Sequence, residues 1–496
     1  MLHACRISVK KIAVFSRSIS SFARSTNPKH PRITKTCALR NGTEELHFDI
    51  GQIGLLADGA ALVRYGKSVL LATAVSAREE RDTDFLPLEV DYRERASGAG
   101  RIPATYFRRE LLPSEKETLT SRLVDRSLRP LFPKQYYMPT QIILSVLAAD
   151  GQNDPDVQAI NAASACLMIS DIPWEGPVAA VRMGRVEGQL VVNPTHDELE
   201  QSDLNLVLAG TRSHVIMIEA LAKNIADADF TAALHVAHNE IQPIISALEE
   251  IGQSRLIPKR RAEQMVPSDA LLQAARDALW ERLTAIYSNR FLSKGDRDTM
   301  QESVGEEAIA ELQKRFHDEQ DIADKAELAV QILQRECFRE LVWNHGIRCD
   351  GRGIDEVRPI TAAVDILPVV HGSSLFQRGD TQCMSIATLA MPDMIQSLDA
   401  ITGGPESKHF FLHYDFPPFA INEVSRLGRA NRREIGHGAL AEKAIRSVLP
   451  SYDHFPYVIR LNANVTMSAG STSMAAVCAG CLALMDAGVP ISQPVA

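Results

Sequence analysis

Two periods organise the hydrophobic positions of this chain. Alternation of apolar and polar residues, typical of half-buried strands, occurs in two stretches, and each stretch also contains the three- and four-residue spacing of amphipathic helices. In the first stretch the pattern predicts strands within 50–74 and at 85–92, 141–148, 174–192 and 204–218, with helices at 156–169 and 225–250. In the second it predicts strands at 364–370, 375–377, 382–389 and 457–465, with helices at 440–449 and 473–486. Because strands and helices come in blocks rather than in strict alternation, we predict an α+β fold.

Between the two stretches the strand pattern disappears. After a capping Ser268, apolar residues such as Leu272, Leu279 and Ile286 recur only at helical intervals, up to about residue 345. We predict a small all-helical domain without chemistry of its own. The predicted boundaries are 1–40 for a leader segment, 41–255 for a first α+β domain, 256–345 for the helical domain and 346–496 for a second α+β domain.

The two α+β stretches share one plan. Glycines recur at the same spacing in 59–68 and 372–381, and an apolar strand pattern follows each segment. Each stretch then reaches an Arg-Arg-Glu triplet, at 108–110 and at 432–434, and a helical pattern after it. Independent insertion of one motif would not carry its neighbours along, so we predict a duplicated domain.

Charge changes the picture at one end of the chain. The 496 residues carry a net charge of −9, which excludes a wholly basic nucleic-acid coat protein but leaves room for a local basic patch. Residues 1–40 contain nine Lys or Arg, six Ser and no Asp or Glu. This composition predicts a mitochondrial presequence, with a disordered basic tail as the alternative. We therefore expect a mitochondrial protein of the matrix or the intermembrane space.

Cysteines and the longest uncharged run predict structure rather than chemistry. The eight cysteines are scattered, which is not a disulfide framework, and the Cys478-x-x-Cys481 pair is more typical of a buried helix than of zinc or redox chemistry. The uncharged run 467–485 opens with Ser, Gly and Thr and is then rich in Ala. It predicts a buried helix, so we expect no membrane-spanning segment.

The sharpest candidate for chemistry is the segment Gly470-Ser471-Thr472-Ser473, between a predicted strand and a predicted helix. Unpaired amides at a helix N-terminus, together with hydroxyl groups, can hold a tetrahedral anion. The alternative is ordinary N-capping by Ser or Thr. Arg432, Arg433 and His437 precede the segment in the same half of the chain; guanidinium groups bind phosphate oxygens, and a histidine can donate a hydrogen bond or a proton. Together these residues predict inorganic phosphate next to a nucleotide phosphodiester.

The first copy has a different set of candidates. Tyr106 and Phe107 can stack on bases, while Arg108 and Arg109 can hold a backbone, which is how single strands are bound without sequence preference. Arginines at three- and four-residue steps would extend this surface along one helix face, with an ordinary solvated face as the alternative; they are Arg122, Arg126 and Arg129. Three further acidic residues are predicted to be turn residues rather than ligands: Asp150, Asp154 and Asp156. We predict no metal site within the chain.

These motifs resemble the polyribonucleotide nucleotidyltransferase (polynucleotide phosphorylase) family, in its mitochondrial form. The matching segments are 106–110, 129–133, 432–438, 470–474 and 483–490. The resemblance implies two RNase PH-like domains (ribosomal protein S5 domain 2-like) joined by an all-helical domain, and a homotrimeric ring. It implies phosphorolysis of single-stranded RNA from the 3′ end, with inorganic phosphate as co-substrate. It also implies that Arg432, Arg433, His437 and the hydroxyls of 471–473 serve phosphate and the 3′ nucleotide. It further implies that 106–109 grip RNA and that an RNA helicase is a partner.

The chain departs from the family pattern in one respect. The Asp and Lys residues that the family uses for Mg²⁺ or Mn²⁺ and for catalysis would lie beyond residue 496, so we expect an incomplete second domain. The alternative to an active enzyme is therefore a catalytically inactive form that binds RNA or assembles a ring. A hydrolytic subunit is a third possibility, which the intact 470–473 segment disfavours.

Overall fold

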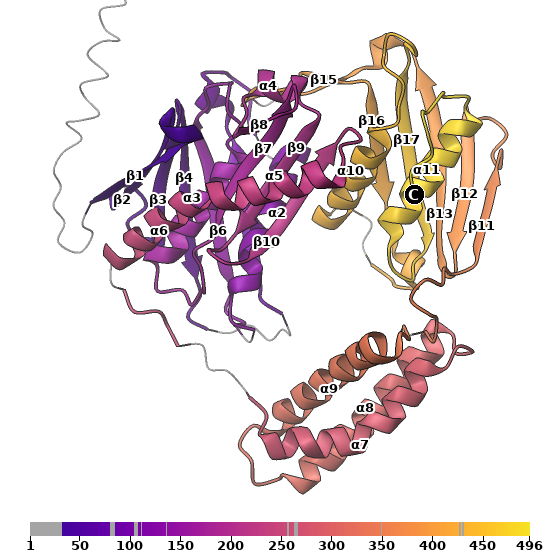
Figure 1. Ribbon diagram of the computed structural model, residues 1–496. Helices are drawn as coiled ribbons and strands as arrows, with labels where there is room; N and C mark the ends of the chain where they lie inside the picture. The colour runs from indigo at the N-terminus through magenta and orange to yellow at the C-terminus, as the bar shows by residue number, and fades with distance from the viewer. Residues whose placement is uncertain are drawn as a thin grey trace, which may run out of the picture. The chain divides into compact units, whose positions relative to one another are not determined.

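The structure is a computed structural model that describes residues 32–79, 85–103, 108–110, 112–134, 136–254, 257–261, 266–348, 350–425, 428 and 431–496. The chain forms two compact units (Figure 1). Unit 1 contains Met1–Phe132, Tyr137–Arg261 and the distant segment Ala400–Gly404. Unit 2 contains the remainder, chiefly Ala262–Asp399 and Pro405–Ala496.

The first sheet of unit 1 has six strands in the order β1-β2-β3-β4-β6-β5. All neighbours are antiparallel except β5 and β6, which are parallel. Apolar side chains alternate along β4, where Leu70, Ala72 and Ala74 are almost fully buried, so one face of the sheet forms core. The strands are β1 (Ile33–Leu39), β2 (Glu44–Ile50), β3 (Gly59–Tyr65), β4 (Ser68–Ser76), β5 (Leu88–Glu94) and β6 (Thr140–Ala148).

A second sheet of unit 1, in the order β10-β9-β7-β8, lies on the other side of helix α3 (Asp156–Ile169). Helix α3 contacts β3 and β4 of the first sheet and β7 of the second, which explains why it is buried along nearly its whole length. The strands are β7 (Ala179–Val186), β8 (Gln189–Val192), β9 (Leu204–Gly210) and β10 (Val215–Ala222). The other helices are α2 (Glu115–Leu128), α4 (His196–Gln201), α5 (Asp227–Glu240) and α6 (Gln242–Ser254).

The sheet of unit 2 has five strands in the order β11-β12-β13-β17-β16. Helix α11 (Thr472–Asp486) packs on β12 and β13, and helix α10 (Arg432–Arg446) packs on β16 and on α11. The strands are β11 (Ile360–Val364), β12 (Gly372–Arg378), β13 (Thr381–Ala390), β16 (Phe410–Asp415) and β17 (Val458–Met467). A short pair, β14 (Gln396–Ser397) and β15 (Ser407–Lys408), lies between β13 and β16 in sequence.

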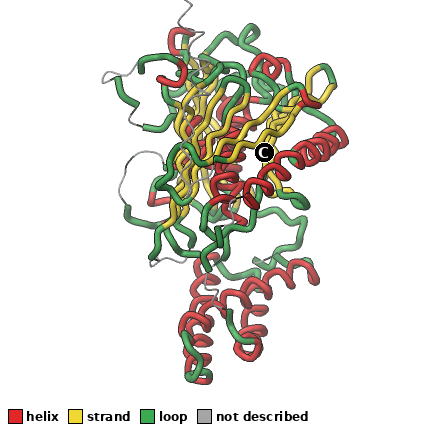
Figure 2. The backbone as a smooth tube through the Cα atoms, turned by 90° about the vertical axis from the view of Figure 1, so that its left-hand side faces the viewer, coloured by secondary structure: helices red, strands yellow, loops and turns green. Residues whose placement is uncertain are grey.

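Unit 2 also contains a region of helices without strands (Figure 2). It consists of α7 (Asp269–Ser288), α8 (Lys294–Arg315) and α9 (Ile322–His345), and Ser268 caps α7 as predicted. Leu279, Leu283 and Leu333 are among its buried residues and form a separate core. The predicted helical region is confirmed, and so is the α+β character of the parts on either side.

The predicted duplication is visible in the two sheets. Strands β11, β12, β13, β17 and β16 repeat the order, the directions and the following helices of β2, β3, β4, β6 and β5. Gly59 and Gly372 open equivalent strands, and a side chain there would lie 2.2 or 2.3 Å from a carbonyl oxygen of the covering helix. Gly66 and Gly379 have φ of +58° and +57° in equivalent two-residue hairpin turns. The repeated glycines therefore serve close packing and turn geometry.

The two Arg-Arg-Glu triplets, in contrast, do not occupy equivalent places. The segment 432–434 forms the first turn of α10, whereas the first turn of α2 is 115–117. Both helices begin with a capping box, made by Ser114 in α2 and by Asn431 in α10. The segment 108–110 lies before α2. The predicted pairing of the triplets is thus wrong. The two copies share the capping box at the start of the helix, not the Arg-Arg-Glu motif.

Three further expectations need correction. The first sheet includes β1, so a boundary at residue 40 between leader and domain is too late. The sheet of unit 2 begins with β11 at Ile360–Val364 rather than at 364–370; Asp365, with φ of +53°, follows the strand. The helix predicted at 225–250 is divided into α5 and α6, where Pro243 cannot donate a backbone hydrogen bond.

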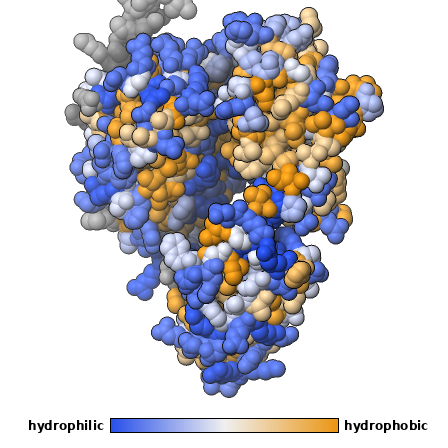
Figure 3. Space-filling model, turned by 45° about the vertical axis from the view of Figure 1, so that its right-hand side comes forward, coloured by the Kyte–Doolittle hydropathy of each residue, from blue (hydrophilic) through white to orange (hydrophobic). Residues whose placement is uncertain are grey.

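Strand β11 lies at the edge of its sheet, and all five of its residues are exposed. Ile360 and Val364 are 57% and 48% exposed, and nearby Val369 is 90% exposed. Figure 3 shows hydrophobic residues gathered on one face of unit 2. Its counterpart β2 is mostly buried between β1 and β3.

Within the described part of the chain, every helix is too short or too polar to serve as a transmembrane span.

Candidate functional site

Helix α10 presents two predicted site residues on a well-capped first turn. The side chain of Asn431 accepts hydrogen bonds from the backbone amides of Arg433 and Glu434, both at 2.9 Å. The carboxylate of Glu434 accepts in return from the Asn431 amide at 2.7 Å and from the Phe416 amide, just after β16, at 3.1 Å. Arg432 and Arg433 are exposed, so the capping box fixes their backbone while their side chains face outward.

The segment 470–473 forms the N-terminus of α11. Gly470 and Ser471 have φ of +94° and +50°, and the Ser471 side chain makes no capping hydrogen bond. The buried hydroxyl of Thr381 accepts from the Ala469 amide at 3.0 Å and donates to the Gly470 carbonyl at 2.9 Å. This clamp holds the loop in the left-handed conformation. Ser471, at the N-cap position, therefore does not provide the ordinary Ser or Thr capping that was the alternative. Gly470 and Ser471 are exposed, whereas Thr472 and Ser473 are buried.

A tyrosine that the sequence did not single out joins these two elements. The hydroxyl of Tyr414, on β16, lies 2.7 Å from the hydroxyl of Thr472, and its ring lies 5.3 Å from the ring of His437, between centroids. Burial raises the pKa of Tyr414 to about 12, against the opposing effects of the Thr472 hydrogen bond and the Arg433 charge. The structure thus brings His437 and Thr472 to the same tyrosine, and Arg433 lies one helical turn before His437 on α10. A lone aromatic residue in a strand has no motif that could have identified it.

The predicted residues of the first copy are only partly described. Tyr106 and Phe107 lie outside the described residues. Arg108 and Arg109 are exposed, and Arg108 has φ of +53° and donates to the Pro103 carbonyl at 3.2 Å. The structure therefore places two arginines at this loop without testing the aromatic stacking.

Arg122 and Arg126 of helix α2, and Arg129 directly after the helix, have different partners. Arg129 donates to both carboxylate oxygens of Asp125, at 2.6 and 2.8 Å, and to the carbonyls of Leu86 and Leu88. Arg126 donates to Glu219 on β10 at 3.1 Å, and Arg122 is half-buried. The donors of Arg129 are used within the domain, which favours a structural role for this residue.

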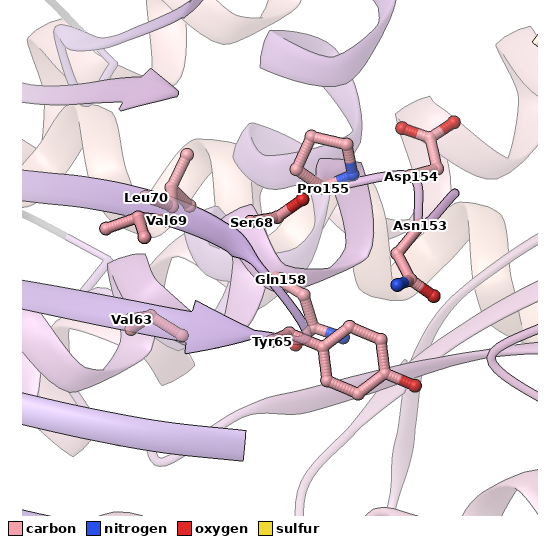
Figure 4. A pocket seen from close by; sticks show the side chains of 9 residues that line it. All are labelled: Val63, Tyr65, Ser68, Val69, Leu70, Asn153, Asp154, Pro155 and Gln158. Atoms are coloured by element: carbon pink, nitrogen blue, oxygen red, sulfur yellow. The ribbon is translucent and has the colours of Figure 1, made fainter. Parts of the chain in front are cut away.

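The three acidic residues of the loop between β6 and α3 also differ. Asp150 is a turn residue, as predicted, because its carboxylate accepts from the amides of Gln152 and Asn153. Asp154 and Asp156 are instead buried among basic side chains, so the prediction of simple turn residues is wrong for these two. A small cavity beside them measures about 10 Å³, roughly one water, which excludes a nucleotide. In Figure 4 the Asp154 carboxylate points away from this cavity.

Comparison with known proteins places the chain in a family. A model described as the 3′ exoribonuclease family, domain 1, matches residues 44–173 and again 356–490, in agreement with the duplication. A model of domain 2 of the same family matches residues 176–240. The solved structure of rice Rrp46 aligns with 47% of this chain and 99% of its own, at 17% identity and a TM-score of 0.33.

Curated relatives extend the similarity to most of the chain. A polyribonucleotide nucleotidyltransferase of Methylacidiphilum infernorum is 46% identical over 92% of this chain and 64% of its own length. Mitochondrial polyribonucleotide nucleotidyltransferases 2 of Arabidopsis thaliana and Oryza sativa are 43% and 40% identical over 92% of this chain and 46% and 47% of theirs. The chain thus spans about half to two thirds of the length of these relatives. The two α+β parts are RNase PH-like domains, and the chain belongs to the 3′ exoribonuclease family.

Proposed function

We propose that this chain serves a phosphate-dependent 3′-to-5′ exoribonuclease, a polyribonucleotide nucleotidyltransferase that releases nucleoside diphosphates from RNA 3′ ends. The observation that carries the proposal is the meeting of His437 and Thr472 at Tyr414, with Arg432 and Arg433 in the first turn of the helix that carries His437, and a helix N-terminus that Ser471 does not cap. Cationic groups and helix amides in one place suit inorganic phosphate. The names of the curated relatives agree with this activity.

In the proposed reaction an oxygen of inorganic phosphate attacks the phosphorus that links the last nucleotide to the RNA. The bond from that phosphorus to the preceding 3′ oxygen breaks, the 3′ oxygen takes a proton, and a nucleoside diphosphate leaves. Arg432 and Arg433 would neutralise the two phosphate groups, while the amides and hydroxyls of 471–473 would orient the attacking phosphate. His437 would donate a hydrogen bond to a phosphate oxygen, or would supply the proton that the 3′ oxygen takes as it leaves.

Tyr414 would support this arrangement without transferring a proton. The phenol is neutral near pH 7, as an ordinary tyrosine is, and burial raises its pKa further, to about 12. It can therefore keep its hydrogen bond to Thr472 through the reaction while its ring limits the movement of His437. We assign Tyr414 a positioning role.

Family resemblance implies Mg²⁺ or Mn²⁺ as a cofactor, and the described residues do not supply a site for it. Among them, no group of three or more His, Cys, Asp or Glu side chains is arranged to hold a metal ion. The proposal therefore assigns no described residue to the metal and writes no step through it.

For the substrate we propose single-stranded RNA, gripped at the exposed Arg108 and Arg109 next to Tyr106 and Phe107. The assembly we propose is a homotrimeric ring in mitochondria, where an RNA helicase would supply unwound substrate. The mitochondrial relatives of two plants and the basic, acid-free residues 1–40 support this location.

The test is incubation of the purified full chain with poly(A), Mg²⁺ and inorganic phosphate, followed by separation of the adenosine nucleotides. We expect ADP that depends on phosphate, and its loss in Arg433→Met but not in the control Arg282→Met, which changes an exposed arginine of the helical region paired with Glu307. AMP formed without phosphate would overturn the proposal.

A second candidate function is RNA binding without catalysis, as a subunit of a larger ring. It is favoured by the lack of a metal-binding cluster among the described residues. In the same assay this form would bind poly(A), measured by filter retention, and release no nucleotide even at high phosphate and Mg²⁺. ADP release by the purified chain would exclude it.

A further inference from the structure

The hydrogen bonds of the two domain copies align them residue by residue near the candidate phosphate site. In the first copy the capping Glu117 accepts from the Glu94 amide at 2.7 Å; in the second the capping Glu434 accepts from the Phe416 amide. Two residues earlier on the equivalent strands are Tyr92 and Tyr414. Tyr92 is therefore the counterpart of Tyr414, whose hydroxyl meets Thr472 in the second copy.

The same alignment identifies the first-copy counterparts of Arg433 and of the loop 469–472. Lys116 and Arg433 each directly precede the capping glutamate. Ser68 accepts from the Asp150 amide at 3.1 Å, just as Thr381 accepts from the Ala469 amide. The first-copy segment 150–156 therefore stands where the second copy has 469–472, and it is longer and acidic.

In the first copy, carboxylates of the chain itself pair with the basic side chains at the equivalent site, Lys116 and Arg182. The ammonium of Lys116 lies 3.0 Å from the Glu94 carboxylate and 3.2 Å from that of Asp154. Arg182, on β7, donates to Asp156 and lies 4.0 Å from Asp154. Burial alone would raise the pKa of Asp154, but the charges of Lys116 and Arg182 lower it to about 2, so it stays ionised. Carboxylates of the chain thus take the place that a bound anion would fill.

The remaining space is filled by the distant segment Ala400–Gly404, which belongs to unit 1. The hydroxyl of Thr402 accepts from Lys116 at 2.5 Å and donates to Glu94 at 3.1 Å, and Thr402 is only 1% exposed. The Thr402 carbonyl lies 3.1 Å from Nε2 of His196. At Gly403 a side chain would lie 2.4 Å from the Gly151 carbonyl oxygen, so the backbone packs directly against the acidic loop.

We propose that the first copy's counterpart of the phosphate site is an internal docking site, closed to phosphate, that binds the chain's own segment Ala400–Gly404 through Thr402. Its carboxylates replace the anion, and the Thr402 hydroxyl bridges Lys116 and Glu94. The docking itself rests on hydrogen bonds within unit 1, and only the comparison with phosphate rests on the proposed function.

Hydrogen–deuterium exchange of the full chain tests the docking. In Thr402→Val we expect exchange of peptides covering 398–406 to rise about tenfold or more, the size expected when a buried hydrogen bond to a charged group is lost. Peptides from β6 and α3 should exchange as in the wild type. Ser407→Ala, an exposed hydroxyl nearby, is the matched control and should leave 398–406 unchanged. Unchanged exchange of 398–406 in Thr402→Val would overturn the proposal.

Calorimetric titration with inorganic phosphate tests the closure separately. Lys116→Met should leave phosphate binding as in the wild type. A loss of phosphate binding in Lys116→Met, at a site that persists in Arg433→Met, would show that the first copy is open and the closure wrong. Failure of the proposed enzyme activity would change neither the exchange result nor this comparison.

Discussion

Tyr414 illustrates how a residue without a catalytic group can determine a site. It contacts Thr472 at the start of α11 and His437 on α10, and it lies near enough to Arg433 for that charge to affect its pKa. Its neutral hydroxyl can bridge the two elements because burial disfavours the phenolate. The position of the site therefore depends on this side chain even though it need not touch the substrate.

At the residue scale, Tyr414→Phe should keep the ring contact and lose the hydrogen bond. We expect a loss of about 1 kcal/mol in the free energy of unfolding, the typical worth of one hydrogen bond, and a higher KM for phosphate. Urea titration and initial rates at varied phosphate measure the two effects. Tyr457→Phe, at an exposed tyrosine, is the control and should change neither. A KM equal to the wild type would argue against the positioning role.

Asp154 gives a prediction about acid stability. Its pKa falls from 3.8 to about 2 in the folded chain because Lys116 and Arg182 favour the charged form. A lowered carboxylate pKa stabilises the fold above the unfolded value and loses that effect as the pH falls through the folded value. The stability difference between wild type and Asp154→Asn should therefore shrink between pH 4 and 2, by about 2 kcal/mol. Urea titrations across this range should show it; a constant difference would contradict the shift.

At the element scale, the backbone geometry of the two domain copies is more similar than their amino-acid sequences. Helices α2 and α10 both begin with a capping box and both bond the end of the preceding strand, yet the residue before the capping glutamate is Lys116 in one and Arg433 in the other. A sequence comparison that follows Arg-Arg-Glu triplets misses this correspondence. In both copies the backbone N–H groups at the helix start need hydrogen-bond partners. Exposed arginines can occur at different positions in the two copies without destabilising the fold.

Helix α11 carries a prediction about its thiols. Burial raises the pKa of Cys478 and Cys481 on this helix, and that of Cys383 on β13 to about 12. Since the thiolate is the reactive form, these cysteines should react slowly with iodoacetamide at pH 8 in the folded chain and quickly after unfolding. Mass spectrometry of labelled peptides measures both states. Rapid labelling of the folded chain would favour the redox or metal interpretation of the Cys-x-x-Cys pair.

At the scale of the whole molecule, phosphate binding should stabilise the fold by mass action. A ligand that binds only the folded chain adds about 2.7 kcal/mol at a concentration one hundred times its Kd. We expect inorganic phosphate to raise the Tm of the wild type and to have a much smaller effect on Arg433→Met. Thermal unfolding at constant ionic strength, adjusted with chloride, measures this. An equal rise in both proteins would mean that phosphate binds elsewhere.

The two domain copies differ in charge at the equivalent places. In the second copy the loop 469–473 carries no charged residue, which suits an incoming anion. The first copy supplies its own carboxylates to Lys116 and Arg182, and it holds Thr402. One architecture therefore supports a proposed open site and a proposed internal docking site.

The α+β class, the helical region, the duplication and the candidate phosphate residues could all be predicted from the amino-acid sequence. These follow from hydrophobic period, from glycines that turns and close packing require, and from motifs contiguous in the chain. Three findings required the folded chain: Tyr414 joins α10 to α11, Arg129 donates within its own domain, and Asp154 and Thr402 meet at Lys116. The physical reason is that these contacts join residues far apart in sequence, and burial and partner charges arise only where the folded chain brings them together.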